Sequence, residues 1–170
     1  EDIVVNLSNE SVDHGSASVI TPSASTNITE LDADVTFDIS VDVASISEEN
    51  AETATFTISL GGDALTGTNT ASVDIDTLGS DATGGTDFSP AILASIATAV
   101  GSITGVSMSG STLTFDSSFV AGSFDFTVSA IDDEDVEGIE DIVVNLSNES
   151  VDHGSASVIT PSASTNITEL

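Results

Sequence analysis

A perfect internal repeat limits what this chain can fold into more than any other feature does. Residues 1–31 recur without a change at residues 140–170, which is an offset of 139 residues. An identity of this length indicates a tandem array of near-identical units, and this chain contains slightly more than one unit. A unit of 139 residues suits a self-contained domain rather than one turn of a solenoid. We therefore expect residues 1–31 to be the C-terminal strand pair of a preceding repeat, and residues 32–170 to be one complete repeat.

Alternation of apolar and polar residues runs through the repeat and predicts β-strands. In residues 35–43 every odd position is apolar and every even position is polar, which is the pattern of a strand with one wet face. Residues 91–100 instead have apolar residues at helical spacing after Pro90, and we expect a short helix there that caps an open end of the sandwich. The pattern as a whole is typical of an all-β sandwich. Strands are expected at residues 1–8, 24–31, 35–43, 53–60, 71–78, 103–106, 112–115 and 123–131, with a loop at residues 11–22.

The charge of the chain excludes several classes of function. The sequence holds 29 acidic residues, no Lys or Arg and two His, which gives a formal net charge of −29. Tracking of nucleic-acid phosphates requires Lys and Arg, so we expect no nucleic-acid partner. The same sign opposes adsorption to anionic membranes, and no apolar stretch approaches the ~20 residues of a membrane span, so we expect no membrane insertion. Because the chain has no Cys, it cannot form disulfides, so any cross-link that stabilises the fold has to be a non-covalent contact or a bound metal.

An acidic stretch between two alternating segments is the strongest candidate for a site. Seven of the eleven residues 131–141 are carboxylates, and the flanking alternation predicts two strands joined by an acidic turn. Carboxylates crowded this closely repel one another, and the chain has no basic side chain to neutralise them. A hard cation such as Ca²⁺ takes six to eight oxygen ligands and accepts irregular loops as a cage. The alternative is a solvated acidic turn without a metal.

Four blocks of residues follow one another in an order that carries a resemblance. They are Ser47-Glu48-Glu49 ahead of residues 53–60, Asp81 with Gly85-Thr86-Asp87-Phe88, residues 111–115, and Asp132-Asp133 with Glu137 and Glu140 ahead of residues 142–148. In this order they resemble the Calx-beta domain, an immunoglobulin-like sandwich of sodium–calcium exchangers, integrin β4 and many bacterial surface repeats. The resemblance covers residues 35–170. The chain departs from the family at residues 90–110, where the family usually has a short connection, and it lacks the basic residues usual after the strand at residues 112–115.

The resemblance implies an immunoglobulin-like antiparallel sandwich that binds Ca²⁺ at one end. The loops of a sandwich cluster at its two ends, so the spacing of the acidic turns permits three of them at one end. Ligation by oxygen alone, without His or Cys nearby, favours calcium over zinc, and magnesium stays an alternative with fewer protein ligands. The residues expected to bind calcium are Glu48, Glu49, Asp87, Asp132, Asp133, Asp135, Glu137 and Glu140.

Other polar residues are expected to have no binding role. His14 and His153 occupy the same position in the two copies and are expected in loops. A further set of acidic residues alternates along wet strand faces and is expected only to keep the surface soluble. This set is Asp34, Asp38, Asp42, Asp74 and Asp76.

Together these features favour a structural role over an enzyme. We expect an extender repeat of a giant bacterial surface adhesin or matrix fibre, extracellular or on the cell surface and rigidified by Ca²⁺. The alternatives are a ligand-binding cell-contact module for carbohydrate or ice, a calcium sensor within a transporter, and the generic acidic surface of a halophile. We expect head-to-tail contacts between neighbouring copies. Either residues 1–31 dock on another copy, or they fill their own sandwich and residues 140–170 are donated onward.

Overall fold

The computed structural model describes residues 2–28, 32–132 and 138–169. The chain divides into two compact units, Glu1–Glu30 and Leu31–Leu170, and each is described by itself. In the described part of the chain, no helix is both long and apolar enough to cross a membrane.

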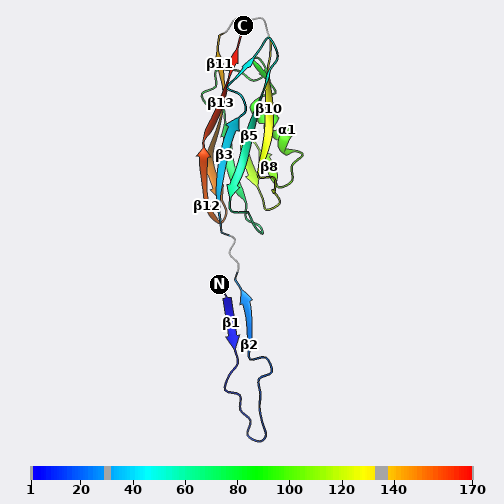
Figure 1. Ribbon diagram of the computed structural model, residues 1–170, viewed down its shortest axis with the longest axis vertical. Helices are drawn as coiled ribbons and strands as arrows, with labels where there is room; N and C mark the ends of the chain where they lie inside the picture. Colours follow the sequence, from blue (N-terminus) through cyan, green and yellow to red (C-terminus); the bar gives the residue numbers. More distant parts are fainter. Residues whose placement is uncertain (1, 29–31, 133–137, 170) are drawn as a thin grey trace. The chain divides into compact units, whose positions relative to one another are not determined.

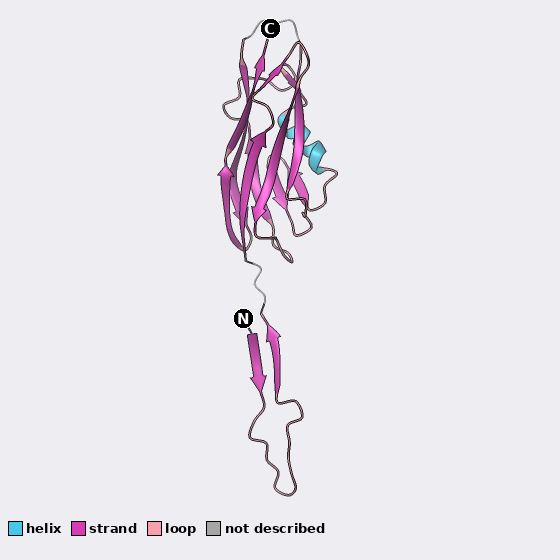
Figure 2. Ribbon diagram, in the orientation of Figure 1, coloured by secondary structure: helices cyan, strands magenta, loops and turns pink. Residues whose placement is uncertain are grey.

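The unit Leu31–Leu170 is a sandwich of two β-sheets (Figures 1 and 2). This confirms the predicted all-β sandwich with one short helix. The five-stranded sheet has the order β12(Gly154–Thr160), β3(Ala33–Val41), β5(Thr53–Gly62), β10(Ser123–Ala130), β7(Phe88–Ser89). The six-stranded sheet has the order β4(Ser45–Ser47), β13(Ser162–Thr168), β11(Glu140–Val151), β6(Ala71–Asp76), β9(Thr112–Phe115), β8(Val106–Ser109).

The core lies between the two sheets and follows from the alternation in the sequence. In β3 the side chains of Val35, Phe37 and Ile39 are at most 2% exposed, while the residues between them face outward. Phe115 of β9 packs against Phe37 across the sandwich, with ring centroids 5.8 Å apart. Burial of these apolar side chains, at about 1.5–3 kcal/mol each, is the main contribution that holds the sheets together.

Two pairs of strands run parallel, which the expected antiparallel pattern did not include. β12 pairs parallel with β3, and β13 pairs parallel with β4. β12 and β13 are separated by Pro161 alone, so this segment crosses from one sheet to the other while keeping its direction (Figure 1). A proline cannot donate a ladder hydrogen bond, which suits the point where a strand leaves its sheet. As a result, β3 begins beside Gly154 at one end of the sandwich, and β13 ends beside Ser47 at the other.

The expected helix is present as α1(Ile92–Val100), but it does not cap an end of the sandwich. Its buried face carries Ile92, Ile96 and Val100, and the helix packs against β10 and β8, which belong to different sheets. The Ser95 hydroxyl donates a hydrogen bond to the Thr127 carbonyl of β10 at 2.7 Å. Figure 2 shows the helix along the side of the sandwich.

The unit Glu1–Glu30 is a two-stranded antiparallel hairpin of β1(Asp2–Asn6) and β2(Ser23–Asn27). Every residue of both strands is exposed. Its register matches that of the copy in the sandwich, because Ile3 pairs with Thr26 as Ile142 pairs with Thr165. The hairpin therefore keeps the pairing of β11 with β13 without the core beneath it.

Candidate functional site

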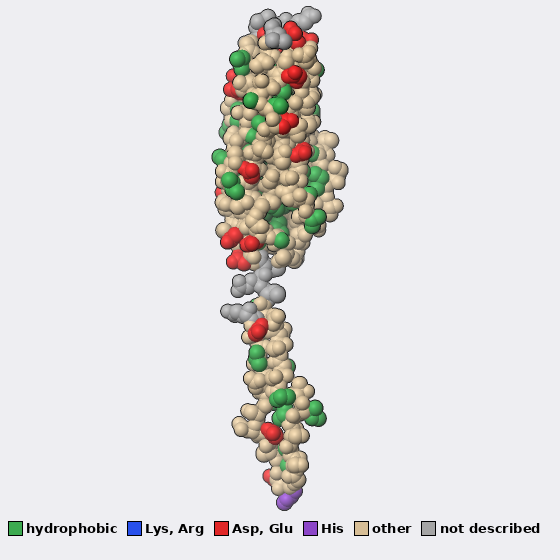
Figure 3. Space-filling model, in the orientation of Figure 1, with side chains coloured by type: hydrophobic (Ala, Val, Ile, Leu, Met, Phe, Trp, Pro, Cys, Tyr) green, Lys and Arg blue, Asp and Glu red, His purple; other side chains and the backbone are tan. Residues whose placement is uncertain are grey.

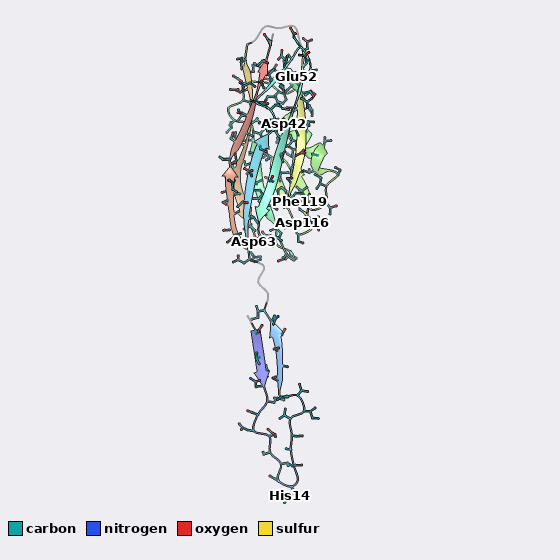
Figure 4. The ribbon with its side chains drawn as sticks, viewed as in Figure 1. His14, Asp42, Glu52, Asp63, Asp116 and Phe119 are labelled. Atoms are coloured by element: carbon teal, nitrogen blue, oxygen red, sulfur yellow. The ribbon has the colours of Figure 1, made fainter. Side chains whose placement is uncertain are left out.

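Three acidic segments meet at the end of the sandwich where β13 leaves it. They are the turn at residues 48–52, the loop at residues 81–88, and Asp132 with residues 138–141, and we call this region the acidic end. Consecutive amides at the end of β10 join the first two segments, because Ala130 N–H donates to the Glu52 carbonyl and Ile131 N–H to the Asp87 carbonyl, each at 2.9 Å. Figure 4 shows Glu52 at this end and Asp63 at the opposite end.

The turn at residues 48–52 is closed by its own polar groups. Ser47 N–H donates to the Glu52 carboxylate at 2.9 Å, and Glu52 N–H donates back to the Ser47 carbonyl at 3.1 Å. Glu48 N–H donates to the Thr168 carbonyl at 3.2 Å, which ties the turn to the last residue of β13. The Glu48 side chain is 7% exposed, whereas Glu49 is exposed. The turn therefore places the buried carboxylate of Glu48 and the exposed carboxylate of Glu49 next to the C-terminal end of β13.

The loop at residues 81–88 is built around buried Asp87, which is 4% exposed. Its carboxylate accepts a hydrogen bond from Thr83 N–H, which folds the loop back on itself. The start of the same loop is bound to β11, because the Asp81 and Ala82 amides donate to the Asp141 carbonyl at 3.2 and 3.3 Å. Asp141 N–H in turn donates to the Asp81 carboxylate. These bonds fix the loop against the beginning of β11.

The structure brings all the described members of the expected calcium set to the acidic end. Glu48, Glu49, Asp87, Asp132 and Glu140 all belong to the three segments defined above. Within residues 2–28, 32–132 and 138–169, no group of three or more Asp, Glu, His or Cys side chains is arranged to hold a metal ion. The three remaining expected ligands, Asp133, Asp135 and Glu137, lie outside the described residues. The calcium site stays a prediction.

Sequence reasoning missed the carboxylates that hold the acidic end together. Glu52 was not a candidate, and Asp81 and Asp141 were not assigned a role in binding. A hydrogen bond from a backbone amide five residues away, as between Ser47 and Glu52, has no motif that would indicate it in the sequence. Ser47 Oγ is buried at the base of the same turn and has no hydrogen-bond partner among the described residues.

Acidic residues expected only to solvate the strand faces also connect neighbouring strands. Asp74 on β6 accepts hydrogen bonds from the Thr112 hydroxyl of β9 and from the Asn148 amide of β11. Asp76 accepts one from the Asn145 amide at 2.8 Å. Figure 3 shows acidic side chains scattered over one face of the sandwich. The hydrogen bonds of Asp74 and Asp76 join adjacent strands, so these two residues contribute structure as well as solubility.

At the opposite end of the sandwich, polar groups hold the turn between β11 and β12. Buried Asn69 donates from its amide to the His153 carbonyl at 2.9 Å and accepts from His153 N–H at 3.0 Å. The Thr70 hydroxyl donates to the Asp152 carboxylate at 2.7 Å and Thr70 N–H donates to it at 3.1 Å. These bonds favour the charged form and hold the pKa of Asp152 below its usual value of 3.8.

The fold and the acidic end define the class of this protein: a β-sandwich domain with acidic loops at the end where its last strand, β13, terminates. No protein-family model matches the chain, and no curated protein matches it. Among solved structures, the chain is similar to the apo form of the Calx CBD1 domain, with a TM-score of 0.45 and 18% identity over 79% of this chain and 97% of that chain.

Two further solved structures are similar to this chain. One is CBD12 from CALX1.2, with a TM-score of 0.47 and 21% identity over 77% of this chain and 43% of that chain. The other is named as the calcium binding domain CBD12 of CALX1.1, with a TM-score of 0.46 and 21% identity over 79% of this chain and 44% of that chain. The match therefore spans less than half the length of these two structures.

Proposed function

We propose that this chain is a structural extender repeat of an extracellular adhesin or matrix fibre, and that Ca²⁺ bound at the acidic end stiffens it. One observation carries the extender role. The sandwich belongs to a sequence that repeats perfectly. Its first strand, β3, begins beside Gly154 at one end, and its last strand, β13, ends beside Ser47 at the other end. A domain with its two ends at opposite poles adds its own length to an array each time it is repeated.

The length added by each repeat follows from the strand that runs through the sandwich. The segment from Gly154 to Thr168 traverses the unit from one end to the other. At about 3.3 Å per residue, this segment spans roughly 45 Å. Leu170 corresponds to Leu31, after which residue 32 begins the next sandwich. The connection between consecutive sandwiches is therefore short, which favours a stiff array over a flexible one.

Calcium suits the chemistry of the acidic end. The exposed Glu49 and Asp132 and the buried Glu48 and Asp87 come from segments that hydrogen bonds hold at one end. The chain has no Lys or Arg to balance their charge. Oxygen-only ligands at irregular loops are what Ca²⁺ prefers. A cation here would tie these loops together next to Thr168, the last residue of β13, and would stiffen the junction with the following repeat.

The test is the melting temperature of the chain in chelator and in millimolar calcium at matched ionic strength. By mass action, calcium at a hundred times its dissociation constant contributes about 2.7 kcal/mol to the free energy of unfolding, so the melting temperature should rise. Magnesium at the same concentration controls for screening of the net charge. Equal melting temperatures in chelator and calcium would contradict the calcium role.

Variants locate the site within the same assay. Asp87→Asn and Asp132→Asn should each reduce the calcium-dependent rise in melting temperature, because they remove carboxylates from the acidic end. Asp74→Asn is the matched control, since it removes the same charge from the outer face of β6. If all three variants reduced the rise equally, calcium would be acting on the diffuse charge of the whole chain rather than at a site.

A further inference from the structure

We propose that the outer face of α1 and the groove beside it form a lateral contact surface for a second copy of this chain. The contact goes beyond the extender role, because it joins arrays side by side rather than end to end, and it does not require calcium. The sandwich is completed by residues 140–170 of the same chain and not by residues 1–31. A contact between copies therefore has to use the outside of the sandwich.

The longest uncharged stretch of the chain contains α1. Residues 88–115 include no Asp, Glu, Lys or Arg, although the chain as a whole has 29 acidic residues. This stretch forms β7, α1, β8 and β9. Figure 1 shows α1 and β8 at the side of the sandwich, between its two ends. The side that carries the helix is therefore low in charge on an otherwise acidic protein.

The helix α1 is apolar on its exposed side as well as on its buried side. Leu93, Ala94 and Ala97 are exposed. Thr98 is exposed too, but its hydroxyl donates a hydrogen bond to the Ala94 carbonyl at 2.9 Å and is satisfied within the helix. A surface helix ordinarily carries charged residues on its outer face, and a helix that is apolar all round is normally buried. The outer face of α1 therefore has the composition of a contact surface.

A groove of about 310 Å³ lies beside this face, between α1 and the end of β6. Its lining consists of Ile75, Asp76, Thr77, Leu78 and Leu93. Leu78 is 79% exposed and Leu93 is 40% exposed. The Asp76 carboxylate accepts hydrogen bonds from Leu78 N–H at 2.9 Å and from the Asn145 amide at 2.8 Å. The groove therefore offers two exposed leucines beside a carboxylate that already has protein partners.

The distribution of charge selects a second copy as the partner. A basic partner would be drawn to the carboxylates on the rest of the surface rather than to the side that carries α1. Another copy is itself strongly acidic, so it approaches closely only where both surfaces are low in charge. A two-fold pairing would bring α1 of one copy against α1 of the other and would place Leu78 of each copy at the groove of its partner.

High salt and tandem repetition should both strengthen this contact. Asp76 and Asp125 lie in hollows beside α1, and each copy has a formal net charge of −29, so two copies repel at low salt. The Debye length falls from about 30 Å at 0.01 M salt to about 3 Å at 1 M, which removes most of that repulsion. Because every repeat of an array carries the same face, weak pairings would add up along two neighbouring arrays.

Two leucine substitutions and two matched controls test the surface. Leu78→Glu and Leu93→Glu place a charge on the face at side chains that are 79% and 40% exposed, so they spare the core. The controls Ile159→Glu and Val43→Glu add the same charge at side chains that are 66% and 37% exposed. Ile159 lies in β12, at the far edge of its sheet from β7, and Val43 precedes β4, at the far edge of its sheet from β8.

Sedimentation velocity of the full chain in chelator, at about 0.01 M and 1 M sodium chloride, measures the association. We expect dimers of about twice the 17.1 kDa of one chain in 1 M salt at high protein concentration, and NMR signals of residues 93–98 that shift with concentration. Leu78→Glu and Leu93→Glu should each raise the dissociation constant of the dimer at least about tenfold. The two controls should leave it close to that of the wild type.

Three outcomes would overturn the proposal. The first is a wild-type chain that stays monomeric in 1 M salt at every concentration, including one that binds phosphatidylcholine vesicles through Leu93, which would assign the face to a lipid surface. The second is a dimer that Leu78→Glu and Leu93→Glu leave unchanged, which would place the contact elsewhere on the chain. The third is a dimer that all four variants weaken equally. None of these outcomes involves calcium, so each is distinguishable from a failure of the calcium role.

Discussion

The same 31 residues occur twice in this chain and adopt two structures. In both copies the first and last strands of the segment pair in the same register: β1 pairs with β2, with Val5 opposite Ala24, and β11 pairs with β13, with Val144 opposite Ala163. Only the second copy is buried, since Val144 is 0% exposed and Val5 is 59% exposed. The register of this hairpin is therefore a local property of its sequence, whereas its burial is supplied by the rest of the sandwich.

The middle of the repeated segment differs more than its ends. Residues 154–160 form β12, which pairs parallel with β3, but the equivalent residues 15–21 form no strand. A parallel strand needs a partner that is distant in sequence, and only the second copy has β3 beside it. The same residues are thus a loop in one setting and a strand in the other, and the neighbouring strand decides between them.

The largest expected difference between the copies comes from the core. Ile142→Ala should lower the free energy of unfolding by about 2–5 kcal/mol, because it empties a fully buried site. Ile3→Ala removes the same atoms from a side chain that is 49% exposed and should change the free energy by less than about 0.5 kcal/mol. Urea denaturation followed by circular dichroism measures both. Equal losses would show that the hairpin is buried as deeply as its copy.

A smaller difference is expected at the glycine of the turn. Gly154 has φ +120°, and a Cβ there would overlap the Ala33 carbonyl, so Gly154→Ala should cost about 1–3 kcal/mol. Gly15 has φ +107° but no atom within 4 Å of such a Cβ. Gly15→Ala should therefore leave the unfolding of the sandwich unchanged in the same urea assay. A Gly154→Ala chain as stable as the wild type would contradict the close approach of β12 to β3.

The smallest expected effect is a dependence on pH through Asp152. Its pKa is lowered from 3.8 by hydrogen bonds from Thr70, so the charged form is favoured in the folded state. The resulting stabilisation is present above the unfolded pKa and is lost as the pH falls through the lower folded pKa. An NMR titration of the Asp152 carboxyl should give a midpoint below 3.8. Thr70→Val should raise this midpoint, and a midpoint that Thr70→Val left unchanged would assign the shift to another cause.

Much of the fold could be predicted because its strands carry a strong local pattern. The alternation in residues 35–43 and 53–60 predicted β3 and β5, and the spacing in residues 91–100 predicted α1. The missed strands are those that depend on distant partners. β4 has three residues and pairs only with β13, and β12 has the sequence that was expected to be a loop. No prediction from the segment alone could be right for both copies.

The acidic end was predictable in outline and not in detail. Carboxylates crowded next to strand ends indicated which loops to consider, and the structure holds these loops at one end through the amides of Ala130 and Ile131. The sequence could not show which carboxylates accept structural hydrogen bonds and which remain available to bind a cation. Glu52 closes a turn and Asp81 binds the start of β11, because these roles depend on backbone amides that the fold brings near.

The repeated segment gains its full structure from the body of the repeat that precedes it. The most direct test is hydrogen exchange on the chain as it stands and on a chain with residues 32–139 added in front of residue 1. In the first chain, the amides of Ile3, Val5 and Leu7 should exchange rapidly, while those of Ile142, Val144 and Leu146 should exchange only on global unfolding. In the extended chain both sets should be equally protected. Continued rapid exchange of Ile3, Val5 and Leu7 in the extended chain would contradict the account.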